Sequence, residues 1–172
     1  MKKAFASALA IVLVFALTVF AAQAEMETVS GATPQVPDEA LIQQIDSYFT
    51  MTKNEILAKH GPGYVVEPTG PEGICDGYFY EDLGMAFAFY PDEDTLELIA
   101  CDENFTIRGV GVGSLFWEIM ESLGHTEIIE TWMEHPDFVV YLMEYHWGDS
   151  VYSFISFDLN EPVHLFWIYQ RP

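Results

Sequence analysis

The sequence predicts an α+β protein made of two tandem repeats, each a short helical layer on an antiparallel β-meander sheet. The stretch MTKNEILAKHGP, starting at Met51, returns as SLFWEIMESLGH, with Gly61 matched by Gly124 63 residues later. After each copy, short apolar runs alternate with turn residues, as antiparallel strands do. Residues 38–49 add the i, i+4, i+7 apolar spacing of a helix. A unit that recurs at a fixed spacing indicates a repeat architecture.

The first 24 residues are predicted to be a cleaved signal peptide. Lys2 and Lys3 precede an apolar run, and Ala22-Gln23-Ala24 supplies the small-x-small pattern that signal peptidase recognises. A retained membrane anchor is the alternative interpretation, because the apolar run is long. Cleavage after Ala24 predicts a secreted or extracytoplasmic protein. Residues 25–37 are small and polar with prolines, which predicts a flexible leader.

Repeat 1 is predicted over residues 38–108 and begins with two helices. Asp38 is a suitable N-cap for the first helix, and Thr52 with Glu55 forms a capping box for the second. Gly61 and the proline after it are expected to end the second helix. Three strand regions are then predicted in YVVE, in GYFYEDLGMAFAFY as two strands around a turn, and in TLELIAC.

Repeat 2 is predicted over residues 109–172, with a helix over about 114–123. Leu115 stands where the first copy has its capping threonine, so Ser114 is expected to cap one residue earlier. Four strands are predicted in TEIIETWM, FVVYLMEYHW, VYSFISFDL and VHLFWIYQ.

This order of helix, glycine and meander resembles the repeat of β-lactamase inhibitory protein and of the SmpA/OmlA outer-membrane lipoproteins. The first copy carries the elements Met51, Thr52, Glu55-Ile56 and Gly61-Pro62 of that pattern, and the second carries Gly113, Glu118-Ile119 and Leu123-Gly124. The resemblance implies a duplicated fold with helices on an antiparallel sheet. It implies a function in docking an enzyme or in envelope assembly, and it transfers no partner-contacting residue to this chain.

The charge excludes several classes of partner. Cleavage after Ala24 leaves 148 residues that hold all 27 acidic residues and four basic ones, a net charge of −23. Such a surface repels phosphate backbones and anionic lipids, so neither a nucleic acid nor a membrane surface is an expected partner. The charge serves solubility in the simpler interpretation. In the more specific interpretation, the negative charge attracts a basic protein partner.

The polar residues form no recognised catalytic or metal-binding pattern. No histidine pair has the helical i, i+4 spacing of a zinc motif, and C-x-x-C and G-x-S-x-G are both absent. The acidic runs lack the alternating ligands of a calcium loop. We therefore expect a protein that is not an enzyme, with no cofactor and no metal.

The two cysteines, Cys75 and Cys101, are expected to form a disulfide because the chain is exported. The strand prediction conflicts with this expectation. A simple meander places them at opposite ends of the sheet, about 20 Å apart, whereas a disulfide requires Cα atoms within about 7 Å. A loop that folds back, a different strand order or two free thiols would each resolve the conflict.

The last strands carry large side chains on both faces, whereas one covered face predicts alternation with polar residues. Either a partner binds the second face, or the repeats or a homodimer mate cover it. We expect one face to be an exposed aromatic surface that binds a partner. Its predicted residues are Tyr141, Tyr145, Trp147, Trp167 and Tyr169.

These observations together predict an exported, non-catalytic protein-binding module that is inhibitor-like and docks a protein on an aromatic sheet face. The alternative is an extracytoplasmic envelope-assembly or structural scaffold protein.

Overall fold

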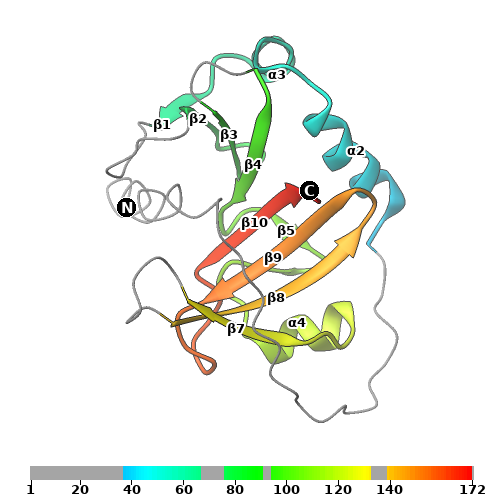
Figure 1. Ribbon diagram of the computed structural model, residues 1–172. Coiled ribbons are helices and arrows are strands. Elements are labelled where there is room, and N and C mark those ends of the chain that lie inside the picture. Colours follow the sequence, from blue (N-terminus) through cyan, green and yellow to red (C-terminus); the bar gives the residue numbers. More distant parts are fainter. Residues whose placement is uncertain (1–36, 67–75, 91–93, 133–138, 172) are drawn as a thin grey trace.

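The computed structural model describes residues 37–66, 76–90, 94–132 and 139–171, and within them the chain is an α+β protein (Figure 1). The helices are α2 (Glu39–Phe49), α3 (Lys53–His60) and α4 (Phe116–Leu123). The main strands are β1 (Tyr64–Val66), β2 (Asp76–Tyr80), β3 (Met85–Phe89), β4 (Leu96–Cys101), β7 (Ile128–Trp132), β8 (Val139–Trp147), β9 (Ser150–Ser156) and β10 (Leu165–Gln170). The predicted α+β class is confirmed.

The eight main strands form one antiparallel sheet in the order β1-β2-β3-β4-β10-β9-β8-β7. Two four-stranded meanders therefore meet where β4 pairs with β10, through Ile99 with Ile168 and Cys101 with Phe166. Figure 1 shows these two strands side by side in the middle of the sheet. Two short strands, β5 (Thr106–Ile107) and β6 (Val110–Gly111), form a separate hairpin.

The helix starts follow the predicted capping, with one exception. Asp38 caps α2 by accepting a hydrogen bond from the N–H of Ala40 (3.0 Å). In α3, Thr52 Oγ1 accepts from the N–H of Glu55, whose carboxylate accepts from the N–H of Thr52 (2.8 Å). At α4 the carboxylate of Glu118 likewise accepts from the N–H of the leucine before the helix (2.8 Å).

The expected cap by Ser114 was wrong. Its Oγ accepts a hydrogen bond from the N–H of Gly111, which precedes the helix, instead of from a helix N–H. Leu115 occupies the N-cap position of α4 with extended backbone angles. A leucine side chain has no acceptor, so this helix start has only half of a capping box.

The two shorter helices end in the same way. Gly61 after α3 and Gly124 after α4 have φ angles of 89° and 92°, a region that glycine adopts without steric cost. The carbonyl of Gly61 accepts a hydrogen bond from the hydroxyl of Tyr80 (2.9 Å), and that of Gly124 accepts one from Tyr145 (2.6 Å). A tyrosine of β2 and one of β8 therefore each bind a helix end to the sheet.

All three described helices pack against the same face of the sheet. Ile45 of α2, Ile56 of α3 and Ile119 of α4 are each 0% exposed and belong to one apolar cluster with strand residues such as Phe87 and Phe154. We call this cluster the helix-side core. Its helical members lie at the apolar positions that the sequence pattern predicted.

Helix α2 also contacts the turn between β8 and β9. Asp46 accepts hydrogen bonds from the Ser150 hydroxyl (2.6 Å) and from the N–H of Asp149 (3.2 Å). Gly148 in this turn has a φ of 61°, and a Cβ atom there would lie 2.7 Å from Cγ2 of Ile42. Glycine at this position therefore provides both the backbone conformation and the space for α2.

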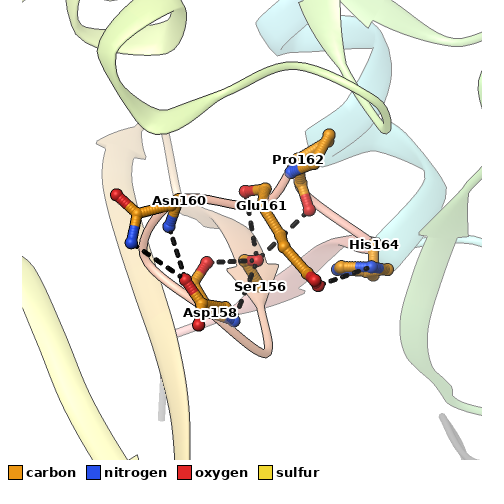
Figure 2. Close-up of polar contacts among 6 residues, drawn as sticks. All are labelled: Ser156, Asp158, Asn160, Glu161, Pro162 and His164. Atoms are coloured by element: carbon orange, nitrogen blue, oxygen red, sulfur yellow. Dashed lines mark hydrogen bonds and ion pairs between the residues drawn. The ribbon is translucent and has the colours of Figure 1, made fainter.

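The loop from β9 to β10 is held by its own polar groups (Figure 2). The buried hydroxyl of Ser156 lies 2.8 Å from the carbonyl oxygen of Asp158, and Oδ1 of Asp158 accepts from the N–H of Asn160 (2.8 Å). The ring of His164 lies 3.7 Å from the carboxylate of Glu161. These contacts fix the entry into β10.

Some predictions lie outside the described residues: the signal peptide, most of the leader and Cys75. Cys101 is buried, and its strand neighbours are Met85 and Phe166. Asp76, the first described residue after Cys75, pairs with Phe89 at the other end of β3. The disulfide remains a prediction. Among the described residues, no helix has the length and apolar character needed to cross a membrane.

Removing each of the two tyrosine–glycine hydrogen bonds is expected to lower the free energy of unfolding by a different amount. Tyr145→Phe is expected to lower the free energy of unfolding by about 1–2 kcal/mol, because it leaves the buried Gly124 carbonyl without a partner. Tyr80→Phe is expected to cost about 0.5–1 kcal/mol, because water can reach the partly exposed Gly61. Urea unfolding measures both. Tyr141→Phe is the control, and an equally large loss there would contradict the assignment.

Candidate functional site

The second face of the sheet carries an apolar cluster to which the described helices contribute no residue. We call it the helix-free face. Its buried members all come from strands: Ala86, Ala88, Leu98, Ala100, Val140, Leu142, Ile155, Leu165 and Trp167. The described helices lie on the opposite face, so within the described part of the chain this face is the one that could present a sheet surface to a partner.

One row of side chains crosses the helix-free face from β1 to β8. Trp167 at its centre pairs with Ala100 on β4 and with Ser153 on β9. From Ala100 the row continues through Ala86, Phe79 and Tyr64 to the β1 edge, and from Ser153 it continues to Glu144. Residues directly opposite one another in a ladder point to the same face. Aromatic side chains therefore lie at the centre of the row and at its β1 end.

The five residues predicted to bind a partner do not share a face, so that prediction was wrong in its geometry. Tyr145 and Trp147 are buried in the helix-side core, and Tyr141 packs partly against it. Trp167 belongs to the helix-free face, where Tyr169 packs beside it. The reason is register. Trp167 aligns through Ser153 with Glu144, so the β8 residues on its face are those with even numbers.

Burial also contradicts the expected exposure of three members of this set. Tyr145 and Trp147 are 3% and 5% exposed, and Trp167 is 9% exposed. Tyr145 stacks on Trp147 with ring centroids 5.0 Å apart. The hydroxyl of Tyr169 donates to Glu144 Oε1 (2.6 Å), and burial followed by this hydrogen bond raises the tyrosine pKa. Tyr145, Trp147 and Trp167 therefore pack within the fold instead of forming an accessible surface.

The accessible aromatic surface lies at the β1 end of the row instead. Tyr64 is 63% exposed and Val65 is 66% exposed, whereas most large apolar side chains in the described residues are buried. Tyr64 aligns with Phe79 and belongs to the row, whereas Val65 aligns with Tyr78 and lies on the other face of β1. Strand β1 is the last in the sheet order and pairs only with β2 among the described strands. An exposed apolar edge strand is a surface onto which another extended chain can pair.

A shallow pocket of about 520 Å³ lies beside β1, where β2 runs into its turn. We call it the β1 pocket. It combines aromatic, acidic and histidine side chains around a glycine: His60, Gly63, Tyr64, Phe79, Tyr80, Glu81 and Asp82. α3, β1 and the β2–β3 hairpin each supply part of the wall, so the pocket exists only in the folded chain.

His60, the last residue of α3, is a titratable group in this pocket. Its ring lies 5.5 Å from the rings of Tyr48 and Tyr80, and its Nε2 is buried without a hydrogen-bond partner within the described part of the chain. Burial and the charge of Lys59 lower the pKa of His60, against a smaller opposing effect of Asp82. The neutral form is therefore favoured, and a neutral imidazole keeps one nitrogen as an acceptor.

The sequence pattern did not predict this site, because the large aromatic residues are concentrated in the last strands. One signal was present: YVV is short and is preceded by Gly61-Pro62-Gly63, which is typical of an edge strand. The pocket itself joins residues about 20 positions apart, and no local pattern marks them. Within the described ranges, no group of three or more His, Cys, Asp or Glu side chains could hold a metal ion.

No protein-family model and no curated protein matches the chain. Among solved structures, a DUF4309 family protein (YjgB) from Bacillus subtilis is similar, with a TM-score of 0.44, 17% identity, and coverage of 70% of this chain and 78% of that one. An extracellular protein containing an SCP domain from Bacillus anthracis gives a TM-score of 0.47 and 10% identity, over 88% of this chain and 50% of that one.

A cysteine-rich secretory protein from Staphylococcus aureus gives a TM-score of 0.42 and 10% identity, over 80% of this chain and 46% of that one. The chain thus spans half or less of the two longer proteins. Both of these neighbours are described as extracellular or secretory.

The lowered pKa of His60 predicts how stability changes with pH. Below a pH of about 6.5 the unfolded chain takes up the proton and the folded chain resists it, so the stability from this residue is lost as the pH falls. NMR titration should place the folded-state pKa of His60 below 6.5. In His60→Phe, the loss of unfolding free energy between about pH 7.5 and 5 should be smaller. An unchanged pH dependence would refute the assignment.

Proposed function

We propose that this chain is an exported, non-catalytic protein-binding module that docks its partner at the β1 end of its aromatic sheet face. The observation that carries the proposal is the exposure of Tyr64 and Val65 on an edge strand beside a pocket. The two side chains lie on opposite faces of β1, so a segment that pairs with this edge can contact both. Exposed large apolar side chains with polar groups around them mark protein interaction sites. Tyrosine suits such a site because it combines contact area with a polar tip.

An edge strand gives a partner two kinds of contact. The side of β1 that no described strand pairs with offers backbone groups to an extended segment, and the pocket beside it offers side-chain recognition. The mature chain's strong negative charge favours a basic partner by speeding encounter. This mode is compatible with an inhibitor-like role, in which the docked segment belongs to the protein being inhibited.

The same proposal includes two tandem repeats, with residues 38–108 and 109–172 as the copies. Each copy supplies a capped helix, a closing glycine bound by a tyrosine, and a four-stranded meander. Adding 67 to a residue number relates Leu96 of the first copy to Val163 of the second. The same addition takes Ile99 to Phe166 and Cys101 to Ile168, so the pair Ile99–Ile168 corresponds to the pair Phe166–Cys101. An approximate two-fold axis through the central pair, Ala100 and Trp167, requires this correspondence.

Export rests on the sequence of residues 1–24 and includes cleavage after Ala24. N-terminal sequencing of the protein recovered from outside the cytoplasm should then begin at Glu25. A chain that keeps Met1 would favour the membrane-anchored alternative.

The binding role is tested by capture from the source culture with immobilised protein. Tyr64→Ser combined with Val65→Ser should reduce capture of the partner by about tenfold or more, because both exposed apolar contacts are lost. Trp117→Ser is the matched control, since this exposed tryptophan lies on α4, in a different part of the fold. Circular dichroism confirms that each variant is folded.

Two outcomes would overturn the proposed role. If the control and the β1 variant lose capture equally, the contact is not at β1. If the β1 variant instead abolishes self-association of the purified chain, measured by sedimentation, the scaffold alternative is favoured over binding of a different protein.

A further inference from the structure

The β1 pocket carries negative charge at its rim. Glu81 and Asp82, in the turn that follows β2, both line the pocket and are exposed. Asp82 lies close enough to influence its neighbours, since its carboxylate adds to the burial that raises the pKa of Tyr80. A pocket with two carboxylates at its mouth favours a cation over a neutral or anionic group.

The pocket walls add aromatic rings to these carboxylates. Tyr64 and Phe79 face each other across the β1–β2 ladder, and Tyr80 follows from the other face of β2. Aromatic rings attract ammonium and guanidinium groups through the negative charge on their faces. The chain already uses this contact twice on α3, where Lys53 lies 4.9 Å from the Tyr78 ring and Lys59 lies 4.4 Å from the Tyr48 ring.

His60 supplies a third element. Its Nε2 is a buried polar atom without a hydrogen-bond partner within the described part of the chain, in a side chain that lines the pocket. The His60 ring packs against Tyr48, Tyr80 and Phe87, so it anchors the pocket wall to the helix-side core.

We propose that the β1 pocket binds the cationic side chain, lysine or arginine, of an extended segment of a protein partner that pairs with the edge of β1 left open by the described strands. The acidic rim and the aromatic walls select the cation. The edge strand holds the backbone that carries it. This inference rests on the proposed function, for which it names the chemistry of the partner.

The test uses nitrogen-15-labelled protein and three small probes: the Nα-acetyl methylamides of lysine, arginine and norleucine. The lysine and arginine probes should shift the amide signals of Gly63, Tyr64 and Asp82 at millimolar concentrations. Norleucine has a side chain of similar length without the charge, and it should bind about tenfold more weakly. A blocked Thr-Val-Lys-Val-Thr peptide should bind more tightly than the lysine probe, because it can also pair with β1.

The variant Glu81→Gln/Asp82→Asn should weaken the lysine and arginine probes about fivefold or more and leave norleucine unchanged. Glu121→Gln/Glu127→Gln makes the same charge change at exposed positions near α4 and β7, so it is the control. If the control weakens binding equally, the general field of the chain attracts the cation and the pocket is excluded. Equal binding of norleucine, or no shift near the pocket, also overturns the proposal.

The probes and the capture experiment can fail separately. If the lysine probe meets these expectations while the Tyr64 and Val65 variant captures normally, the pocket is a cation site and the proposed docking role fails. If capture depends on β1 while the norleucine probe binds as tightly as the lysine probe, the docking role stands and the cation preference fails.

Discussion

The pairing of β4 with β10 is the contact on which the rest of the structure depends, because it joins two four-stranded meanders into one sheet. Ile99, Cys101, Phe166 and Ile168 all point from this seam into the helix-side core. Each meander alone would offer a narrow sheet with one further edge. Joined, they form a surface broad enough for three helices to cover one face, and they bury the central edges that would otherwise remain open to other chains.

The elements could be predicted from local patterns, and their relative placement could not. Helix caps such as Thr52 and Asp38, and the alternating pattern of strands, depend on a few neighbouring residues. The main helices and strands therefore lie at the predicted places. Which face a strand residue occupies depends on pairing between distant strands. The sequence placed Trp147 and Trp167 together, whereas the register across β9 puts them on opposite faces. The β5–β6 hairpin is only two residues deep on each side, too short for a periodic signal.

The candidate site illustrates the same limit from the opposite side. Tyr64 and Val65 form an ordinary apolar pair in the sequence, and only their position at the end of the sheet makes them accessible. Trp167 was the more conspicuous residue, yet its central position among Ala100 and Ser153 makes it part of the sheet's interior packing. In this chain the rigid centre supports the fold, and the edge is free to carry recognition.

The contact between α2 and the β8–β9 turn has a consequence for the order of assembly. Asp46 and its partners Asp149 and Ser150 are 103 and 104 positions apart in the chain. A helix that is synthesised among the first folded segments therefore cannot dock fully until the second meander has formed its hairpin. Contacts between such distant segments slow folding, and the end of α2 that faces the β8–β9 turn stays uncovered in the meantime. Packing of the N-terminal half is therefore complete only after the C-terminal half has formed its hairpin.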